Sequence, residues 1–255
     1  MLLLLYEIAE NLTMVKASIS HPGMEKIDTS GAYGRFFRRV PSGYASQFKE
    51  DSFLFDRPIY ELLKRIMDIF GSLCVVLLTI WLYPIIGFFI WFEDGGSVFH
   101  IQDRIGRDCR LFRVYKFRTM RPGADARWPE KKDKRVTYWG HFLRKTRLDE
   151  LPQLWSVLKG DLSLVGPRPD LVDFYPLLKS SIQDYDLRYK ILPGMTGWAQ
   201  VSQSIQPASV EQTRERFEYD LYYIKNRSLW LDIKILMKTF LILLGVVSKD
   251  PSSMV

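Results

Sequence analysis

Two adjacent carboxylates, Asp149 and Glu150, are the residues of this 255-residue sequence best suited to chemistry. They open a segment whose apolar residues recur at helical spacing, and the free N–H groups at a helix start favour anions and phosphates. Because neighbours on a helix diverge by about 100 degrees, the two cannot share one proton. One can instead attack phosphorus, as in aspartyl-phosphate chemistry, while the other holds a divalent cation. In the structural alternative, Asp149 caps the helix and Glu150 complements its dipole.

Cations flank this acidic pair in the sequence. Arg144 and Arg147 precede it, and Arg168 follows within the motif Gly166-Pro167-Arg168-Pro169. An arginine held between two prolines can present its planar fork to phosphate oxygens with less entropy to lose. An ordinary surface arginine in a turn is the alternative. The clustered cations favour the phosphate-handling interpretation of the acidic pair.

Charge and composition narrow the class of protein. The formal net charge of +7 implies attraction to nucleic acid, anionic lipid or phosphorylated substrates. With 47% apolar and 25% charged residues, the chain fits neither a disordered protein nor a polytopic membrane protein. The usual nucleic-acid-binding motifs are absent from the sequence, so we expect no nucleic-acid partner. Cys74, Cys109 and three scattered histidines lack metal-ligand spacing, which disfavours a zinc site or a disulfide scaffold.

The apolar stretch from Ile69 to Phe92 indicates a membrane segment. Its 24 residues carry no charged side chain, and as a helix they would reach roughly 36 Å. Pro84 predicts a kink or break near Leu82 to Pro84. Three basic residues lie on each side, as expected of a helix-break-helix that returns to the face it entered. We therefore expect a re-entrant membrane hairpin over 58–96, with a buried core helix as the alternative.

The 57 residues before this hairpin predict a loosely structured N-terminal extension. The run Leu2 to Leu5 is too short and too close to acidic residues for a secretory signal, and we expect it to begin a small helix. A basic aromatic patch, Arg35-Phe36-Phe37-Arg38-Arg39, could contact anionic lipid or could be an ordinary solvated surface.

Residues 97–255 predict a catalytic domain of helices around a small β-hairpin. The hairpin pairs Val98 to Gln102 with Leu111 to Phe117, and one helix is expected around Tyr138 to Lys145. A second helix should run from Asp149, its N-cap candidate, to Gly160 at its C-terminal end. We therefore expect an α+β fold that is mainly helical.

Two further helices are predicted near the C-terminus. Ser209 and Gln212 form a capping-box pattern that opens a helix through Ile224. In Leu229 to Val247, an apolar stripe with charged residues elsewhere suits an amphipathic helix lying in a membrane interface, or equally a core helix. The stripe comprises Trp230, Ile233, Met237, Phe240, Leu241 and Leu244.

Six motifs together make the sequence resemble the bacterial sugar transferases called monotopic phosphoglycosyl transferases. They occur in the same order over roughly residues 64 to 240. The motifs are Lys64-Arg65-Ile66-Met67-Asp68, Gln102-Asp103-Arg104-Ile105-Gly106, Lys116-Phe117-Arg118-Thr119-Met120, Leu148-Asp149-Glu150-Leu151-Pro152-Gln153-Leu154, Gly160 to Pro169, and Pro193-Gly194-Met195-Thr196-Gly197-Trp198-Ala199-Gln200. The chain differs from the family in having Tyr83-Pro84 where Ser-Pro is frequent, and in its long extension.

The resemblance implies an enzyme that moves a sugar 1-phosphate from a UDP-sugar to undecaprenyl phosphate and releases UMP. It also implies the cytoplasmic face of the bacterial inner membrane, and the first membrane step of surface-glycan assembly. A hard oxygen-bound cation such as Mg²⁺ suits a diphosphate substrate. A non-catalytic single-pass membrane adaptor is the alternative, although it gives no role to the acidic pair or to the Pro-Arg-Pro loop.

Residue roles follow from the same resemblance. Asp149 is implied to be the nucleophile, and Glu150 is implied to help bind Mg²⁺. Lys116, Arg144 and Arg168 match positions associated with phosphate binding or support of the active site. Asp220 matches a further acidic position of the active-site region.

Overall fold

The structure is a computed structural model, and it describes residues 57–121, 123, 133–203, 207 and 209–247. All of these residues belong to one compact unit of the chain, Val40–Lys249. The predictions for residues 1–56, including the basic aromatic patch, lie outside the described residues.

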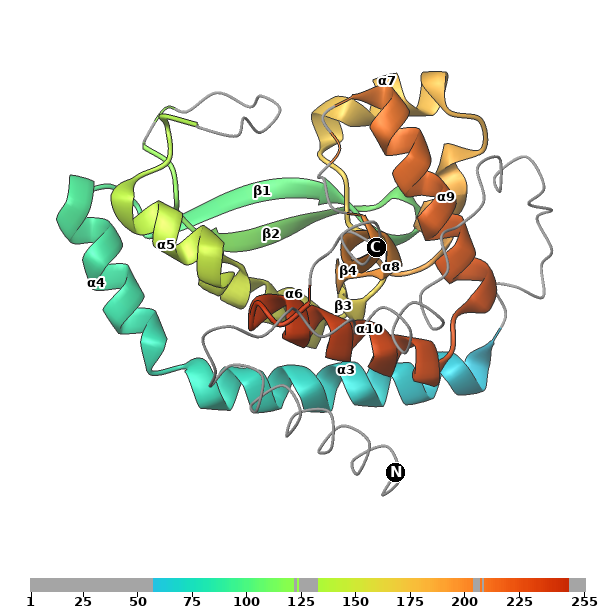
Figure 1. Ribbon diagram of the computed structural model, residues 1–255, viewed down its shortest axis with the longest axis horizontal. Helices are drawn as coiled ribbons and strands as arrows, with labels where there is room; N and C mark the ends of the chain where they lie inside the picture. The colour runs from blue at the N-terminus through green and yellow to red at the C-terminus, as the bar shows by residue number, and fades with distance from the viewer. Residues whose placement is uncertain (1–56, 122, 124–132, 204–206, 208, 248–255) are drawn as a thin grey trace, which may run out of the picture. The chain divides into compact units, whose positions relative to one another are not determined.

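The predicted helix-break-helix is present as α3 (Pro58–Thr79) and α4 (Leu82–Asp94), which are bent by 62° (Figure 1). The break falls at Ile80 and Trp81, just before the predicted position. Pro84 is the third residue of α4, where a missing backbone N–H costs no helical bond, so the chain bends in the preceding turn. Gly95, with φ 69°, ends α4, close to residue 96 where the predicted hairpin ends.

Within the described residues, no single helix is both long and apolar enough to cross a membrane. The bent pair of α3 and α4 meets those requirements of length and composition when its two helices are taken together.

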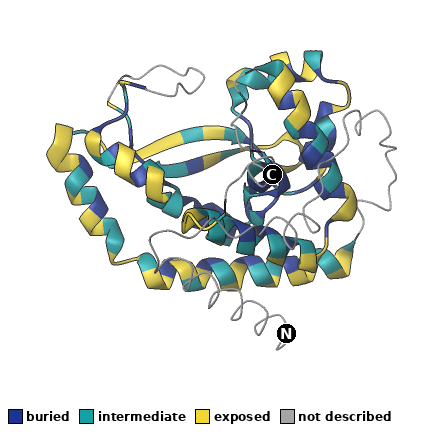
Figure 2. Ribbon diagram, viewed as in Figure 1, coloured by how far each residue is buried: buried dark blue, intermediate teal, exposed yellow. Residues whose placement is uncertain are grey.

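The two sides of α3 differ sharply in chemistry. One side buries Lys64, Asp68, Ser72 and Val76, which recur every four residues and therefore share a face. The other side is apolar and exposed, as the yellow segments of α3 in Figure 2 indicate. Its exposed large side chains are Ile59, Leu62, Leu63, Ile66, Ile69, Phe70, Leu73, Leu77 and Leu78.

The polar side of α3 attaches the helix to the rest of the protein. Lys64 pairs with Asp232 at 2.9 Å, between two buried side chains. Arg65 donates to the carbonyls of Val157 at 2.6 Å and Leu158 at 2.8 Å, which lie in the last turn of α6 (Leu154–Lys159). The backbone N–H of Gly160, the C-cap residue, also donates to the Val157 carbonyl at 3.1 Å, so Arg65 adds side-chain donors to a helix end that Gly160 caps.

Two small sheets complete the scaffold. Strand β1 (Phe99–Ile105) pairs antiparallel with β2 (Leu111–Phe117), which confirms the predicted hairpin. Strand β3 (Ser163–Val165) pairs in parallel with β4 (Gly194–Thr196), a pairing that the sequence analysis did not predict. A Cβ on Gly194 would lie 2.0 Å from the backbone nitrogen of Gly166. These two segments of the backbone can therefore approach this closely only with glycine at position 194.

Helices form most of the remaining structure, as predicted. Helix α9 is capped by Ser209, whose Oγ accepts from Gln212 N at 3.3 Å, and α10 ends before Gly245, whose φ of 71° is unfavourable for other residues. The α-helices of this part are α5 (Tyr138–Thr146), α6 (Leu154–Lys159), α7 (Tyr175–Ser181), α8 (Trp198–Ser202), α9 (Val210–Asn226) and α10 (Leu229–Leu243).

The core lies where these helices meet the sheets. The most deeply buried apolar side chains come from α6, β3, α9 and α10, among them Val157, Val165, Leu221 and Ile235. A second cluster joins α4, β2 and α5. The expectation of a mainly helical fold with a two-stranded antiparallel sheet is therefore confirmed.

Candidate active site

The acidic pair lies in a short 3-10 helix, Leu148–Gln153, and not at the start of an α-helix. Arg147, with φ 60°, ends α5 and occupies the N-cap position, which leaves Asp149 in the first turn. The prediction of Asp149 as an N-cap is therefore wrong. The α-helix α6 begins only at Leu154, since Pro152 lacks the N–H that an α-helix would use.

Three cations converge on one oxygen of Glu150. Glu150 Oε1 lies 3.2 Å from Lys116 Nζ, 3.0 Å from Arg168 Nη2 and 4.0 Å from Arg147 Nη1. Burial opposes the ionisation of Glu150, but the charges of Lys116, Arg168 and Arg147 outweigh burial and hold its pKa well below the usual range. Glu150 is thus a permanent anion at neutral pH.

Asp149 has the opposite electrostatic environment. Burial raises its pKa, the neighbouring Glu150 charge raises it further, and Lys116 and the arginines offset part of the shift. Its exposed fraction is 9%, and its Oδ1 is buried without a hydrogen-bond partner in the part of the chain that the structure describes. An unpaired buried carboxylate oxygen is costly, which is typical of functional sites.

The cationic side chains come from three separate elements. Lys116 lies on β2, where burial lowers its pKa and Glu150 counteracts that shift. Arg144 lies at the end of α5 and donates from Nε to Thr119 Oγ1 at 2.9 Å. Arg168 lies in the loop after β3, so the fold brings residues that are distant in sequence to Glu150.

Asp220 lies apart from the acidic pair, in a buried network behind the Arg168 loop. Its carboxylate pairs with Arg188 at 2.9 Å. Arg188 also donates to the main-chain carbonyl of Arg168 at 2.7 Å and contacts Asp170. Asp170 in turn accepts from Arg216 at 2.6 Å. Asp220 therefore reaches Arg168 through Arg188.

Two arginines of this region were not selected from the sequence. Arg188 belongs to a segment between motifs, and its role depends on contacts with Asp170 and Asp220 far along the chain. Arg104 belongs to the motif Gln102 to Gly106, one of the six that carry the family resemblance, and this motif could have marked it as a site residue. It donates to the carbonyl of Pro169 at 3.0 Å and so supports the same loop.

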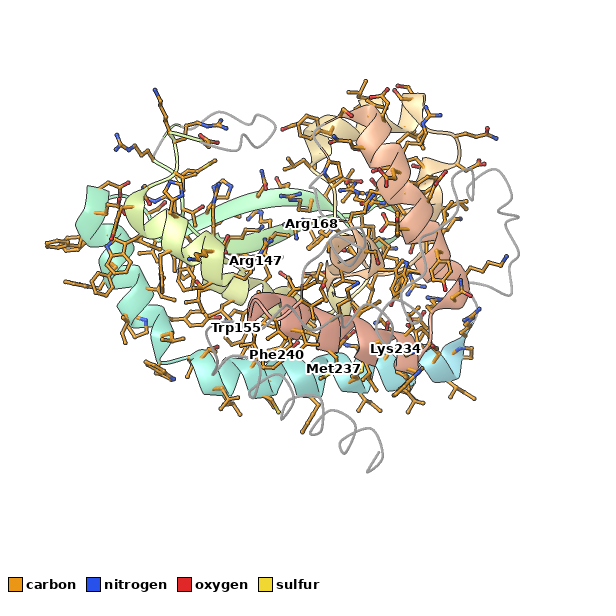
Figure 3. The ribbon with its side chains drawn as sticks, in the orientation of Figure 1. Arg147, Trp155, Arg168, Lys234, Met237 and Phe240 are labelled. Atoms are coloured by element: carbon orange, nitrogen blue, oxygen red, sulfur yellow. The ribbon has the colours of Figure 1, made fainter. Side chains whose placement is uncertain are left out.

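A cavity of about 760 Å³ adjoins the acidic pair. It is lined by acidic and cationic side chains, by uncharged polar residues such as Thr196 and Gln200, and by apolar residues, most of them leucine, isoleucine and valine. The cationic residues that line it are Arg104, Arg144, Lys145, Arg147, Arg168 and Arg216. Asp149, Lys116 and Asp220 are not lining residues. Figure 3 shows Arg147 and Arg168 above α10.

The donor set fits a magnesium ion that arrives with its substrate. Among the described residues, no group of three or more histidine, cysteine, aspartate or glutamate side chains converges on a metal position. Mg²⁺ is usually held by one or two carboxylates together with substrate phosphates and water. The unpartnered Oδ1 of Asp149 beside Glu150 matches that smaller requirement.

The fold and the site define a cationic cavity beside two carboxylates, an arrangement whose chemistry suits phosphate groups. A family model described as bacterial sugar transferase matches residues 59–246. The chain belongs to this bacterial sugar transferase family.

Relatives with curated names extend the comparison. The chain is 42% identical over 189 residues to a UDP-N-acetylgalactosamine-undecaprenyl-phosphate N-acetylgalactosaminephosphotransferase of Aeromonas hydrophila, which covers 73% of this chain and 44% of the relative. It is 38% identical over 193 residues to the UDP-glucose:undecaprenyl-phosphate glucose-1-phosphate transferase of Escherichia coli K12, covering 73% of this chain and 42% of the relative. An undecaprenyl-phosphate galactose phosphotransferase of Salmonella typhimurium is 40% identical over 198 residues. The match covers 69% of this chain and 39% of that relative. The chain spans less than half the length of these relatives.

Proposed function

We propose that this chain transfers a sugar 1-phosphate from a UDP-sugar to undecaprenyl phosphate. The observation that carries the proposal is the convergence of Lys116, Arg168 and Arg147 on Glu150, next to the unpartnered Asp149 oxygen. The names of the relatives supply the class of donor and acceptor. The cationic cavity favours this enzyme over the alternative of a non-catalytic adaptor.

The reaction proceeds through an acyl phosphate on Asp149. The ionised carboxylate attacks the sugar-bearing phosphorus, the bond from that phosphorus to the bridging oxygen breaks, and UMP leaves with the electron pair. An oxygen of the lipid phosphate then attacks the same phosphorus. The Asp149 carboxylate departs with its electron pair, and a lipid-linked diphosphate sugar is formed.

The cations stabilise charge that develops on the phosphoryl oxygens. Arg144 and Arg168 line the cavity and are placed to donate to a diphosphate. Lys116 holds Glu150 in position and keeps it ionised. Asp220 acts indirectly: it pairs with Arg188, and Arg188 holds the Arg168 loop through the main-chain carbonyl of Arg168.

Mg²⁺ is the proposed cofactor, with Glu150 as its main protein ligand and Asp149 beside it. When bound, the ion offsets negative charge on the diphosphate during transfer. The low pKa of Glu150 supports this role, because a ligand to a hard cation must be ionised.

We further propose that α3 and α4 form a re-entrant hairpin in the bacterial inner membrane, with residues 97–255 as the catalytic domain on its cytoplasmic face. The exposed apolar side of α3 supports this arrangement, since soluble surfaces rarely carry so large an apolar patch. Helix α10 would lie in the interface: it buries Asp232 and Ile235 while exposing Trp230 and Phe240.

Release of UMP by the detergent-solubilised full chain tests the enzymatic proposal. The donors are UDP-glucose, UDP-galactose and UDP-N-acetylgalactosamine, each with undecaprenyl phosphate. We expect UMP and a lipid-linked sugar from at least one donor, and neither product from Asp149→Asn. Equal UMP release by the wild-type and variant proteins would refute the assigned role of Asp149.

A further inference from the structure

The cavity beside Glu150 has two parts of opposite chemistry. Its cationic part is suited to phosphate, as described above. The residues of α3 and α10 that line the cavity are Val75, Leu236, Thr239, Ile242 and Leu243, of which only Thr239 is polar. A UDP-sugar has no hydrocarbon chain that would pack along such a wall. The two-part lining therefore fits a ligand with a phosphate at one end and a hydrocarbon chain at the other.

Helix α10 separates the cavity from an exposed apolar surface. Leu236, Ile242 and Leu243 line the cavity, whereas Trp230, Ile233 and Phe240 are exposed. In Figure 3, Met237 and Phe240 lie along the edge of α10 nearest α3, and Arg147 and Arg168 lie above the helix. One helix thus presents apolar side chains both to the cavity and to the outside.

Two residues mark where the cavity reaches that surface. Val75 and Leu243 line the cavity, yet they are also 39% and 49% exposed. Side chains that line a cavity and are this exposed are expected at an opening, or mouth, of that cavity. Leu78, which is exposed, follows Val75 by three residues on α3 and is therefore its neighbour on the helix surface, so apolar surface adjoins this mouth.

We propose that the acceptor lipid enters the active site through this mouth, with its isoprenoid chain passing between Val75 and Leu243. Its phosphate then lies at the cationic end, near Arg147 and Arg168, and its chain remains in contact with the apolar surface. This inference rests on the proposed function, because it places the acceptor of that same reaction. It adds the residues that select a long isoprenoid chain.

Leu243→Trp tests the route by narrowing the mouth, and Leu244→Trp is the matched control. Leu244 is the next residue, is exposed, and does not line the cavity. The measurements are the KM for undecaprenyl phosphate, the KM for the UDP-sugar, and the rate with a water-soluble phosphate that carries one or two isoprene units. Val75→Trp provides a second variant on the other side of the mouth.

We expect Leu243→Trp and Val75→Trp to raise the KM for undecaprenyl phosphate by about tenfold relative to Leu244→Trp, as a steric change in an apolar pocket does. The KM for the UDP-sugar and the rate with the short acceptor should stay close to those of the control. Equal acceptor KM values in all three variants would overturn the route alone. A wild-type protein that neither releases UMP nor carries label from a donor labelled in its sugar phosphate would overturn the proposed function, and the route with it.

Discussion

Arg188 donates a hydrogen bond from Nη2 to the main-chain carbonyl of Arg168, 2.7 Å away. Arg188 is itself buried and pairs with Asp220 at 2.9 Å. The side chain of Arg168 in turn contacts Glu150. A continuous series of polar contacts therefore connects α9 with the acidic pair, and it predicts that a residue remote from the cavity affects catalysis.

Asp220→Asn should reduce both stability and kcat. The change leaves the buried Arg188 charge with one carboxylate fewer, and breaking a buried pair costs about 3 kcal/mol. Because Arg188 positions the Arg168 loop, kcat should fall while the KM for the UDP-sugar changes little. Denaturation and steady-state kinetics measure the two effects. A loss of stability with kcat unchanged would show that the network is structural only.

Asp149→Asn and Glu150→Gln should change stability at pH 7 in opposite directions. The pKa of Glu150 is held low, so its ionised form stabilises the fold above an unfolded pKa of about 4.3, and this contribution is lost as the pH falls below that value. Replacing it should cost about 3 kcal/mol, because three cations lose their shared anion. The measurement is the unfolding midpoint of each variant.

The pKa of Asp149 is raised, so its ionisation costs stability as the pH rises from about 3.9 through the folded value. Asp149→Asn removes that cost and should be at least as stable as the wild type at pH 7, although it is inactive. When unfolding midpoints are measured from pH 3 to pH 8, those of Asp149→Asn and the wild type should converge at the acidic end. A strongly destabilised Asp149→Asn would contradict the assigned electrostatics.

Removal of divalent cations should abolish turnover. Excess EDTA leaves Glu150 without the ion that it is proposed to hold, and added Mg²⁺ should restore the rate of UMP release. Circular dichroism with and without EDTA serves as the control, since the described fold needs no metal to pair its buried charges. Full turnover in EDTA would remove Mg²⁺ from the proposal.

Single cysteines placed near Pro58 and Gly96 should react with reagents on the same side of the membrane. The bend of 62° at Ile80 and Trp81 and the equal basic flanks underlie this expectation. Cys74 and Cys109 must first be replaced, because both are free thiols. Labelling from opposite sides would establish a crossing segment in place of a re-entrant one.

Local patterns in the sequence predicted local structure well. The capping bond of Ser209, the hairpin before Phe117 and the end of α6 at Gly160 depend on residues a few positions apart, and all are present. The N-cap prediction for Asp149 failed because the left-handed backbone at Arg147, a residue without a glycine's freedom, is set by packing that no local pattern reveals.

The site was predictable in its residue types and not in its contacts. The acidic pair and Arg168 stand in recognisable motifs, so their participation could be expected. Arg188 could not be selected, because its partners Asp170 and Asp220 lie 18 and 32 residues away and no periodicity relates them. The raised pKa of Asp149 likewise follows from burial by distant elements.

The contacts of Lys64 and Arg65 also determine how a detergent-free form of this protein could be engineered. Deleting α3 would remove the Lys64 partner of the buried Asp232 and the Arg65 donors to the last turn of α6, so the remaining chain should misfold. Replacing the outward side chains instead, such as Leu62, Ile66 and Phe70, leaves every one of those contacts intact. Polar residues on the outward face of α3 would then make the protein soluble without detergent. The helix itself would still support the core through Lys64 and Arg65.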